Sequence, residues 1–434
     1  MVSASGINSH EIGLALSCND RQFARIRRVL YAYPVMWGVG FGGLYWPILL
    51  LICASNMTYD RSRRTQWTSI VFVIAALACS ALVGSVQFGF DPTRILGLAG
   101  NISVWLCILL LLNLSRFQAD VKIIIAKSFV ILALFQGALT LVAQTIYPAR
   151  VPLPLLQSFA PGMPSGVAAF AYDKLYYYDW LGGAAFRSAG VMANPTWAGA
   201  VAAVAIFAAV YVFKENRTWK FLSLISVMAA IYSIDMSLSR SVLYAVIGAA
   251  AVTIIEAIRQ RQPMVGYWLW TVCGVSVTLL LSIWWGSVVE WVDSVNGERA
   301  GSLQSRGEIY SRTWAYIKDL PVPILGFGVK PQEDNLAASI ASHSTYLGLL
   351  FRGGMIGLAA FIVFLAKSAR VVIGRGDPVA VGILSFVAIW CILEDFDAGH
   401  LLPMAVLMAV CASHAELQTR ACQMESSAVE RQKK

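Results

Sequence analysis

Charged residues are scarce in this chain of 434 residues. Asp, Glu, Lys and Arg together make up 13% of it, about half of their share in ordinary soluble domains. Hydrophobic residues make up 58%, and the mean hydropathy is +0.66. A soluble protein of this length cannot bury so large an apolar fraction, because part of the chain must form its surface. The composition therefore excludes an ordinary soluble protein and favours a membrane protein.

Cysteine, histidine and known nucleotide-binding sequences are also rare or absent. No pair of the eight cysteines has the spacing of metal ligands, so neither a zinc site nor a structural disulfide is predicted. The chain has no Walker sequence, no Gly-x-Gly-x-x-Gly and no nucleophile elbow. We expect no metal and no cofactor. The net charge of +9 lies mostly in short loops, where it sets membrane orientation, so we do not expect nucleic-acid binding.

The chain does contain long stretches without charged residues. The segments 67–90, 196–213 and 264–289 are each long enough to cross a hydrocarbon core. They do not alternate between apolar and polar residues, which favours helices over a barrel. The pattern predicts an all-α polytopic membrane protein with about 12 transmembrane helices. The predicted helices are 29–41, 43–56, 66–89, 95–115, 121–146, 196–213, 219–236, 240–258, 265–289, 344–366, 378–393 and 399–416.

The basic loops predict the topology. If they face the cytoplasm, the tails 1–28 and 417–434 are cytoplasmic and 29–416 forms a single transmembrane domain. Two longer loops, 147–195 and 290–342, then lie on the outer face, where we expect interfacial helices and the functional surface. The segment 29–56 fits either one tilted span or a broken pair. No cleavable signal peptide is predicted, so the first helices are expected to direct insertion.

Arginines in these outer loops require an explanation, because outer loops are usually poor in basic residues. Arg187 precedes Asn194 and a proline, a combination that favours a helix start and so brings a guanidinium close to a helix N-terminus. Arg240 enters a predicted span directly after Ser239. Both suit a phosphate group. The alternative for each is an arginine anchored at the membrane interface.

Arg306 begins a further candidate helix, 305–320. At helical spacing it shares a face with Tyr310 and Thr313. This arrangement favours a binding face, whereas the alternative is an amphipathic helix on the membrane surface with a solvated Arg306.

His343 is the candidate general base, because it begins a span on the same outer side as the arginines and imidazole titrates near neutrality. Arg352 lies further along that span, where a charge must face protein or water. It could contact a phosphate or pair with Glu394, Asp395 or Asp397. The sequence Asp395-Phe-Asp397 also has the form of a metal-bound phosphate site, a weaker hypothesis.

Four segments, read in order, resemble the signature of the O-antigen ligase and polymerase superfamily. They are Arg187-Ser-Ala-Gly-Val-Met-Ala-Asn194-Pro195, Ser237-Leu-Ser-Arg240-Ser241, Ser305-Arg306-Gly-Glu-Ile-Tyr310 with Leu325-Gly-Phe-Gly328, and His343-Ser-Thr-Tyr346 with Gly353-Gly-Met-Ile-Gly357.

This resemblance implies a GT-C-like membrane fold and an inverting, metal-independent glycosyltransferase. Its donor would be an undecaprenyl-diphosphate-linked oligosaccharide, and its active site would face the periplasm from the bacterial inner membrane. His343 would orient or deprotonate the acceptor hydroxyl. The residues implied to bind the diphosphate are Arg187, Arg240, Arg306 and Arg352, and those implied to contact the acceptor or support the site are Asn194, Tyr310 and Tyr346.

The resemblance leaves the acceptor open. We favour a polymerase of exopolysaccharide or O-antigen repeat units, which would work beside a flippase and a chain-length regulator. An O-antigen ligase that transfers the glycan to lipid A core uses the same donor. A polysaccharide or lipid transporter is the alternative from another class, because many helices and intramembrane charges fit it too.

Overall fold

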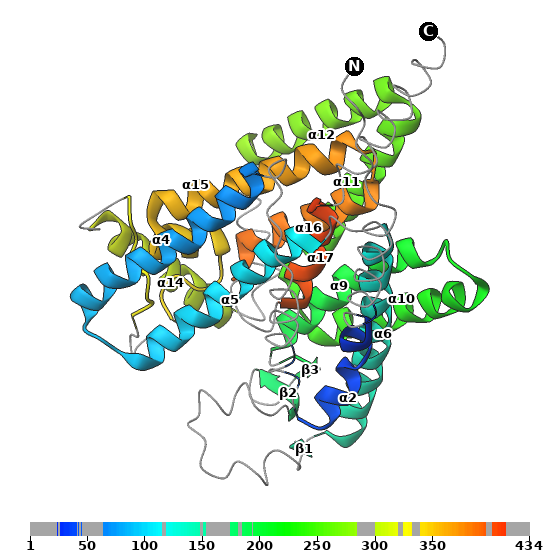
Figure 1. Cartoon of the computed structure of the whole chain (residues 1–434), viewed down its shortest axis with the longest axis horizontal. Coiled ribbons are helices and arrows are strands. Elements are labelled where there is room, and N and C mark those ends of the chain that lie inside the picture. The colour runs from blue at the N-terminus through cyan, green and yellow to red at the C-terminus, as the bar shows by residue number, and fades with distance from the viewer. Residues whose placement is uncertain are drawn as a thin grey trace, which may run out of the picture.

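The structure is a computed structural model that describes residues 24, 27–40, 42, 45, 64–114, 119–147, 151–152, 174–180, 185–192, 194–283, 300–319, 324–331, 339–395 and 402–413. Helices form most of this part of the chain (Figure 1). In chain order the helices are α2 (Tyr33–Gly38), α4 (Arg64–Phe88), α5 (Pro92–Leu114), α6 (Ala119–Ile146), α9 (Pro195–Val212), α10 (Arg217–Ser237), α11 (Arg240–Arg261), α12 (Pro263–Ile283), α14 (Ala300–Lys318), α15 (Thr345–Gly374), α16 (Pro378–Leu393) and α17 (Leu402–Ser413).

Among the described residues, six helices are long and apolar enough to cross a membrane, namely α4, α6, α9, α10, α11 and α15. Two shorter apolar helical segments are Gly97–Leu112 and Pro378–Leu393. Lipid offers no hydrogen-bond partners to the backbone, so a helix that satisfies its own amides is the stable conformation for such segments. The prediction of a helical polytopic membrane protein is confirmed, whereas the number of 12 spans stays a prediction. The second half of the predicted pair in 29–56 and most of both tails lie outside the described residues.

The first long outer loop departs from expectation, because its described residues form strands rather than interfacial helices. Strands β1 (Val151–Pro152), β2 (Lys174–Trp180) and β3 (Ala185–Gly190) make an antiparallel sheet in the order β1-β2-β3. Tyr178 pairs with Arg187 in the register of β2 and β3. Three consecutive tyrosines and a tryptophan in β2 have high strand propensity. The described residues of this loop therefore show strands that the sequence analysis did not predict, and the fold is not purely α-helical.

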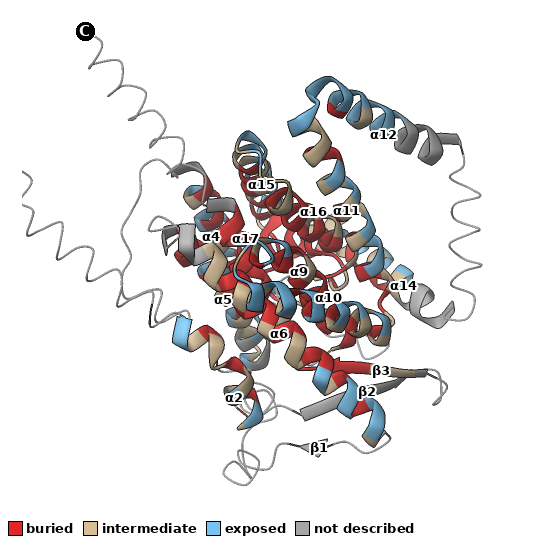
Figure 2. Ribbon diagram, turned by 90° about the vertical axis from the view of Figure 1, so that its right-hand side faces the viewer, coloured by how far each residue is buried: buried red, intermediate tan, exposed pale blue. Residues whose placement is uncertain are grey.

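Helix α9 lies at the centre of the bundle (Figure 2). Most of its residues are buried, from Pro195 through Val212. Its many alanines allow α6, α10 and α16 to approach closely, because small side chains permit tight helix packing in membranes. Two other helix pairs flank this centre, α4 with α15 and α11 with α16. The buried residues of these helices therefore form one continuous core.

Polar contacts gather at the two ends of the bundle. At the predicted cytoplasmic end, Asp377 caps α16 and accepts hydrogen bonds from Lys122 and from the Tyr211 hydroxyl, the latter at 2.8 Å. Burial raises the pKa of Asp377, but the charge and hydrogen bond of Lys122 outweigh it and hold the pKa below its usual value. Lys127 pairs with Glu215 at 3.0 Å at the same end. The opposite end carries the candidate site.

Candidate active site

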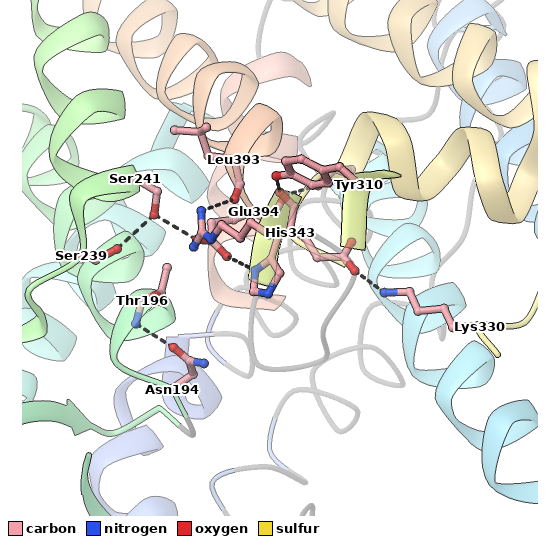
Figure 3. A network of polar contacts seen from close by, with 12 residues as sticks. Asn194, Thr196, Ser239, Ser241, Tyr310, Lys330, His343, Leu393 and Glu394 are labelled. Carbon is pink, nitrogen blue, oxygen red and sulfur yellow. Dashed lines mark hydrogen bonds and ion pairs between the residues drawn. The ribbon is translucent and has the colours of Figure 1, made fainter. Parts of the chain in front are cut away.

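Helices α11, α14, α15 and α16 meet at one residue, Glu394 (Figure 3). Glu394 follows the last residue of α16 and is only 6% exposed. Its backbone carbonyl accepts hydrogen bonds from the amide of Thr345, at 3.0 Å, and from the Thr345 hydroxyl, at 2.9 Å. These bonds join the end of α16 to the start of α15. The Glu394 side chain is therefore held in a fixed position between helices that are far apart in sequence.

Three polar side chains surround the Glu394 carboxylate. The Nη2 atom of Arg306 donates to Oε1 at 2.7 Å, and the Ser241 hydroxyl donates to the same oxygen at 3.1 Å. The Nδ1 atom of His343 lies 3.6 Å from Oε2. That separation is longer than a normal hydrogen bond but within the range of ion pairing. Arg306, Ser241 and His343 come from α14, α11 and the turn before α15, so only the tertiary fold brings them together.

The charge state of Glu394 follows from these neighbours. Burial by itself raises the pKa of the carboxyl group. The contact with His343 and the positive charge of Arg306 lower it, and the net effect is a pKa below the usual value. Glu394 is therefore ionised at neutral pH and is available to orient an imidazole.

His343 sits in a strained turn that α14 holds in place. Its φ is 64°, and that of Ala341 is 60°. The Tyr310 hydroxyl donates to the His343 carbonyl at 2.6 Å, and the Ala341 amide donates to the Thr313 hydroxyl at 2.9 Å. The prediction that Arg306, Tyr310 and Thr313 share one face of a helix is confirmed. That face contacts the site, so Arg306 is not merely solvated.

Backbone strain is concentrated at this end of the molecule. Among the described non-glycine residues, positive φ occurs at Leu238, Ala341 and His343. Leu238, at 48°, forms the tight turn between α10 and α11, next to Ser239 and Arg240. Non-glycine residues in this conformation cost roughly 1–3 kcal/mol each and persist where the surroundings over-determine them, often at functional sites. The strain supports a functional role for this region.

Arg187 and Arg240 lie beside the network on its α10 side. Arg187, on β3, donates from Nε to the carbonyl of Ser237 at 2.8 Å. Ser237 ends α10, and Arg240 begins α11 three residues later. Ser239 and Ser241, on either side of Arg240, contact each other through their hydroxyls at 3.1 Å. Arg187 therefore contacts the end of α10, and Arg240 begins α11 between two serines of this region.

Asn194 caps a helix as predicted. Its side-chain oxygen accepts from the amide of Thr196 at 2.8 Å, and Pro195 occupies the first turn of α9. Figure 3 shows Asn194 and Thr196 on the same side of the network as Ser239 and Ser241. Tyr346 instead donates to the carbonyl of Ala388 at 3.1 Å and so joins α15 to α16. This contact favours the supporting role for Tyr346 over direct contact with an acceptor.

Arg352 is 1% exposed and lies apart from His343. Its Nη2 atom is 3.4 Å from Oδ1 of Asp395, and Lys330 binds the other oxygen of Asp395. Of the two described candidates, Glu394 and Asp395, the structure pairs Arg352 with Asp395. Asp397, and with it the hypothetical metal-bound pair, lies outside the described residues. Among the described side chains, no three His, Cys, Asp or Glu residues gather as metal ligands.

A break in α15 shapes the region around Arg352. Gly354 has a φ of 62°, which interrupts the helical hydrogen bonds. The amides of Phe327 and Gly328 donate to the carbonyls of Phe351 and Arg352, both at 2.8 Å. The segment 324–331 thus satisfies backbone groups that the break releases. This insertion fixes the segment that carries Lys330 against α15.

Sequence reasoning missed the central position of Glu394. It considered Glu394 only as a partner for Arg352, because no pattern relates Arg306 and Glu394 across 88 residues. The available signal was an acidic residue in an outer loop of a chain poor in charge. Sequence reasoning also missed Lys330, which binds Asp395, and Arg94, which donates to the Lys330 carbonyl.

The fold and the site together define a class of protein: a polytopic helical membrane protein with arginines, a histidine and a buried glutamate at one end of the bundle. Residues 225–362 match the family model described as O-antigen ligase. The match confirms the resemblance to the O-antigen ligase and polymerase superfamily that the sequence showed. The matched segment covers less than half of the chain and contains Arg240, Arg306 and His343. No curated protein matches the chain with significant similarity.

Proposed function

We propose that this protein is an inverting membrane glycosyltransferase that polymerises surface polysaccharide at the periplasmic face of the bacterial inner membrane. The donor is a glycan linked to undecaprenyl diphosphate, and the acceptor is a hydroxyl of another lipid-linked repeat unit. The observation that carries the proposal is the contact of Arg306 and His343 with one buried carboxylate, Glu394. A GT-C-like arrangement of about 12 spans is part of the same proposal.

The arginines supply the positive charge that the leaving group needs. A diphosphate leaves with negative charge on its oxygens, and guanidinium groups stabilise such charge by paired hydrogen bonds. Arg306 has five N–H donors, and its contacts with Glu394 and the Leu393 carbonyl leave capacity for a phosphate oxygen. Arg187 contacts the last residue of α10, and Arg240 is the first residue of α11. Together the three arginines form a clamp for the donor diphosphate.

Glu394 and His343 prepare the acceptor. The carboxylate faces Nδ1 of His343, so Nε2 is the ring nitrogen left for the acceptor hydroxyl. The imidazole takes the hydroxyl proton as the oxygen attacks the anomeric carbon. The bond from that carbon to the diphosphate oxygen breaks, and the lipid diphosphate leaves with the electron pair. Attack from the face opposite the leaving group inverts the anomeric configuration.

The test is complementation of a strain lacking this gene with His343→Ala. Surface polysaccharide is read by gel and protein level by immunoblot of the membrane. We expect normal protein level and loss of long-chain glycan. Arg312→Ala is the matched control, because Arg312 is exposed on the same outer helix that carries Arg306. If His343→Ala and Arg240→Ala both leave the glycan unchanged, the proposal is wrong.

An O-antigen ligase is the second candidate, favoured by the description of the matching family model. The same gel separates the two functions. Loss of a polymerase leaves single repeats on lipid A, whereas loss of a ligase leaves bare lipid A core.

A further inference from the structure

A cationic pocket lies beside the Glu394 network; its lining includes Arg352 but not Arg306, His343 or Glu394. It is formed between α5, the segment 324–331 and α15, and has a volume of about 240 Å³. A pocket of this volume can admit a sugar ring. The residues that line it are Arg94, Gly97, Leu98, Asn101, Gly328, Val329, Lys330 and Arg352.

Three of these residues carry positive charge and are held by hydrogen bonds. Lys330 and Arg352 bind the two oxygens of Asp395. The Nη1 atom of Arg94 donates to the backbone carbonyl of Lys330 at 2.9 Å, and its Nε atom pairs with Asp91 at 2.9 Å. Two carboxylates thus face three cations, and the cluster keeps a net positive charge. The geometry is built for an anion, because the cations are positioned by protein contacts before any ligand enters.

The charge balance around Lys330 agrees with this. Burial lowers the pKa of Lys330, Asp395 raises it, and the positive charge of Arg352 lowers it again, so that the net pKa lies below the usual value. A further negative charge in the pocket would stabilise the ammonium form.

The pocket adjoins the catalytic centre through consecutive residues. Asp395 holds Lys330 and Arg352, and the preceding residue, Glu394, contacts His343 and Arg306. Figure 3 shows Lys330 on the side of the network opposite Ser239 and Ser241. Arg187 and Arg240 lie on the Ser241 side, where we place the donor diphosphate. An anion bound next to Lys330 is thus separate from that diphosphate but close to the reacting hydroxyl.

We propose that this pocket binds the carboxylate of an acidic sugar, such as a hexuronic acid, in the glycan that the enzyme handles. This inference rests on the proposed function and names its substrate class. A carboxylate fits the paired donors of Arg94 and Arg352 and the ammonium group of Lys330. The Asn101 amide, also in the lining, offers donors and an acceptor for ring hydroxyls. Recognition of a sugar charge beside the reactive centre selects acidic repeat units over neutral ones.

The first test is the composition of the glycan itself. Polysaccharide is purified from cells complemented with the wild-type gene, and its acidic sugars are measured by acid hydrolysis and chromatography. We expect a uronic acid in the repeat unit. If the wild-type glycan contains only neutral sugars and is lost in His343→Ala, the acidic-sugar proposal is overturned while the transferase function stands.

The second test measures binding to the full-length protein in phosphatidylcholine nanodiscs, with trigalacturonic acid as probe and its neutral galactose trimer as comparison. We expect the wild-type protein to bind the acidic trimer only. Lys330→Gln or Arg94→Gln should weaken this binding about 10- to 100-fold, which is the range for loss of a charged hydrogen bond. Lys318→Gln, at an exposed lysine of α14, is the matched control and should bind normally. Equal binding of both trimers, or unchanged binding in the pocket variants, overturns the proposal.

Inorganic pyrophosphate distinguishes this site from the donor clamp. We expect Arg240→Gln to weaken pyrophosphate binding and Lys330→Gln to leave it unchanged. If Lys330→Gln abolishes pyrophosphate binding, the pocket is a phosphate site and the acidic-sugar proposal is wrong. If Arg240→Gln has no effect on pyrophosphate but Lys330→Gln weakens the acidic trimer, the clamp fails and the pocket stands.

Discussion

Replacement of Glu394 by Gln tests the site most directly, because it removes one charge and little volume. In the wild-type protein Glu394 is 6% exposed, and its carboxylate accepts hydrogen bonds from Arg306 at 2.7 Å and from Ser241 at 3.1 Å. A charged hydrogen bond contributes about 1.5–3 kcal/mol and a neutral one about 0.5–1.5 kcal/mol. Replacement of the charged bond by a neutral one should therefore reduce the free energy of unfolding by about 1–2 kcal/mol.

The effect on the reaction should be larger than the effect on stability. Without the carboxylate, His343 loses the group that fixes its tautomer and orientation. Base catalysis contributes about 10²- to 10⁴-fold, and each tenfold loss is about 1.4 kcal/mol of barrier. We expect kcat for Glu394→Gln to fall by about 10²- to 10⁴-fold, which corresponds to roughly 3–5 kcal/mol.

The assay is glycan transfer by purified protein in nanodiscs, followed by gel, with folding checked by thermal unfolding. Glu308→Gln is the matched control, because Glu308 is an exposed carboxylate on α14 and its removal should leave kcat within about threefold. The double variant Glu394→Gln with His343→Ala should be no slower than His343→Ala alone, since residues that act as a unit are not additive. A folded Glu394→Gln protein with wild-type kcat would refute the role assigned to this carboxylate.

Three further predictions follow from the same structure. The folded-state pKa of Glu394 lies below its usual value of 4.5, so the ionised carboxylate stabilises the fold above that pH, and this stabilisation is lost as the pH falls through the folded-state pKa. Thermal unfolding at decreasing pH should therefore show a smaller loss of stability in Glu394→Gln than in the wild type. Identical curves would contradict this. Gly326→Ala should destabilise the protein by about 1–3 kcal/mol, because the new Cβ would lie 2.2 Å from the Phe351 carbonyl oxygen; Gly100→Ala, with no atom within 4 Å, should be neutral or stabilising in thermal unfolding. In a background without native cysteines, Arg312→Cys should react with a membrane-impermeant maleimide added from the periplasmic side, and reaction only after permeabilisation would reverse the topology.

The sequence predicted much of the local structure. The long apolar segments are helices because lipid leaves the backbone no other way to satisfy its hydrogen bonds, and that requirement is local to each segment. The cap at Asn194 and the shared face of Arg306, Tyr310 and Thr313 were predictable for the same reason, since both depend on spacing of a few residues. The strands at 174–180 and 185–190 were missed, because their tyrosine-rich pattern lies inside a loop assumed to be helical.

The sequence also identified which residue types on the outer face needed an explanation. Arginines in outer loops of a chain with few charges stand out without any structure, because the membrane makes buried charge costly. This argument selected Arg187, Arg240 and Arg306, and Arg352 was selected because it lies within a predicted span. It did not separate them by role, since their partners are distant in sequence.

Only the tertiary structure decided which charged side chains pair with one another. It placed Arg306 and His343 on Glu394, but Arg352 and Lys330 on Asp395, although the two carboxylates are neighbours in the chain. Electrostatic pairing depends on distance through space, and that distance is set by the packing of α14, α15 and α16 rather than by local pattern. The sequence by itself therefore determined a helical membrane protein and selected a small set of arginines for explanation. The packed bundle determined that the charges form two groups, one around Glu394 and one around Asp395.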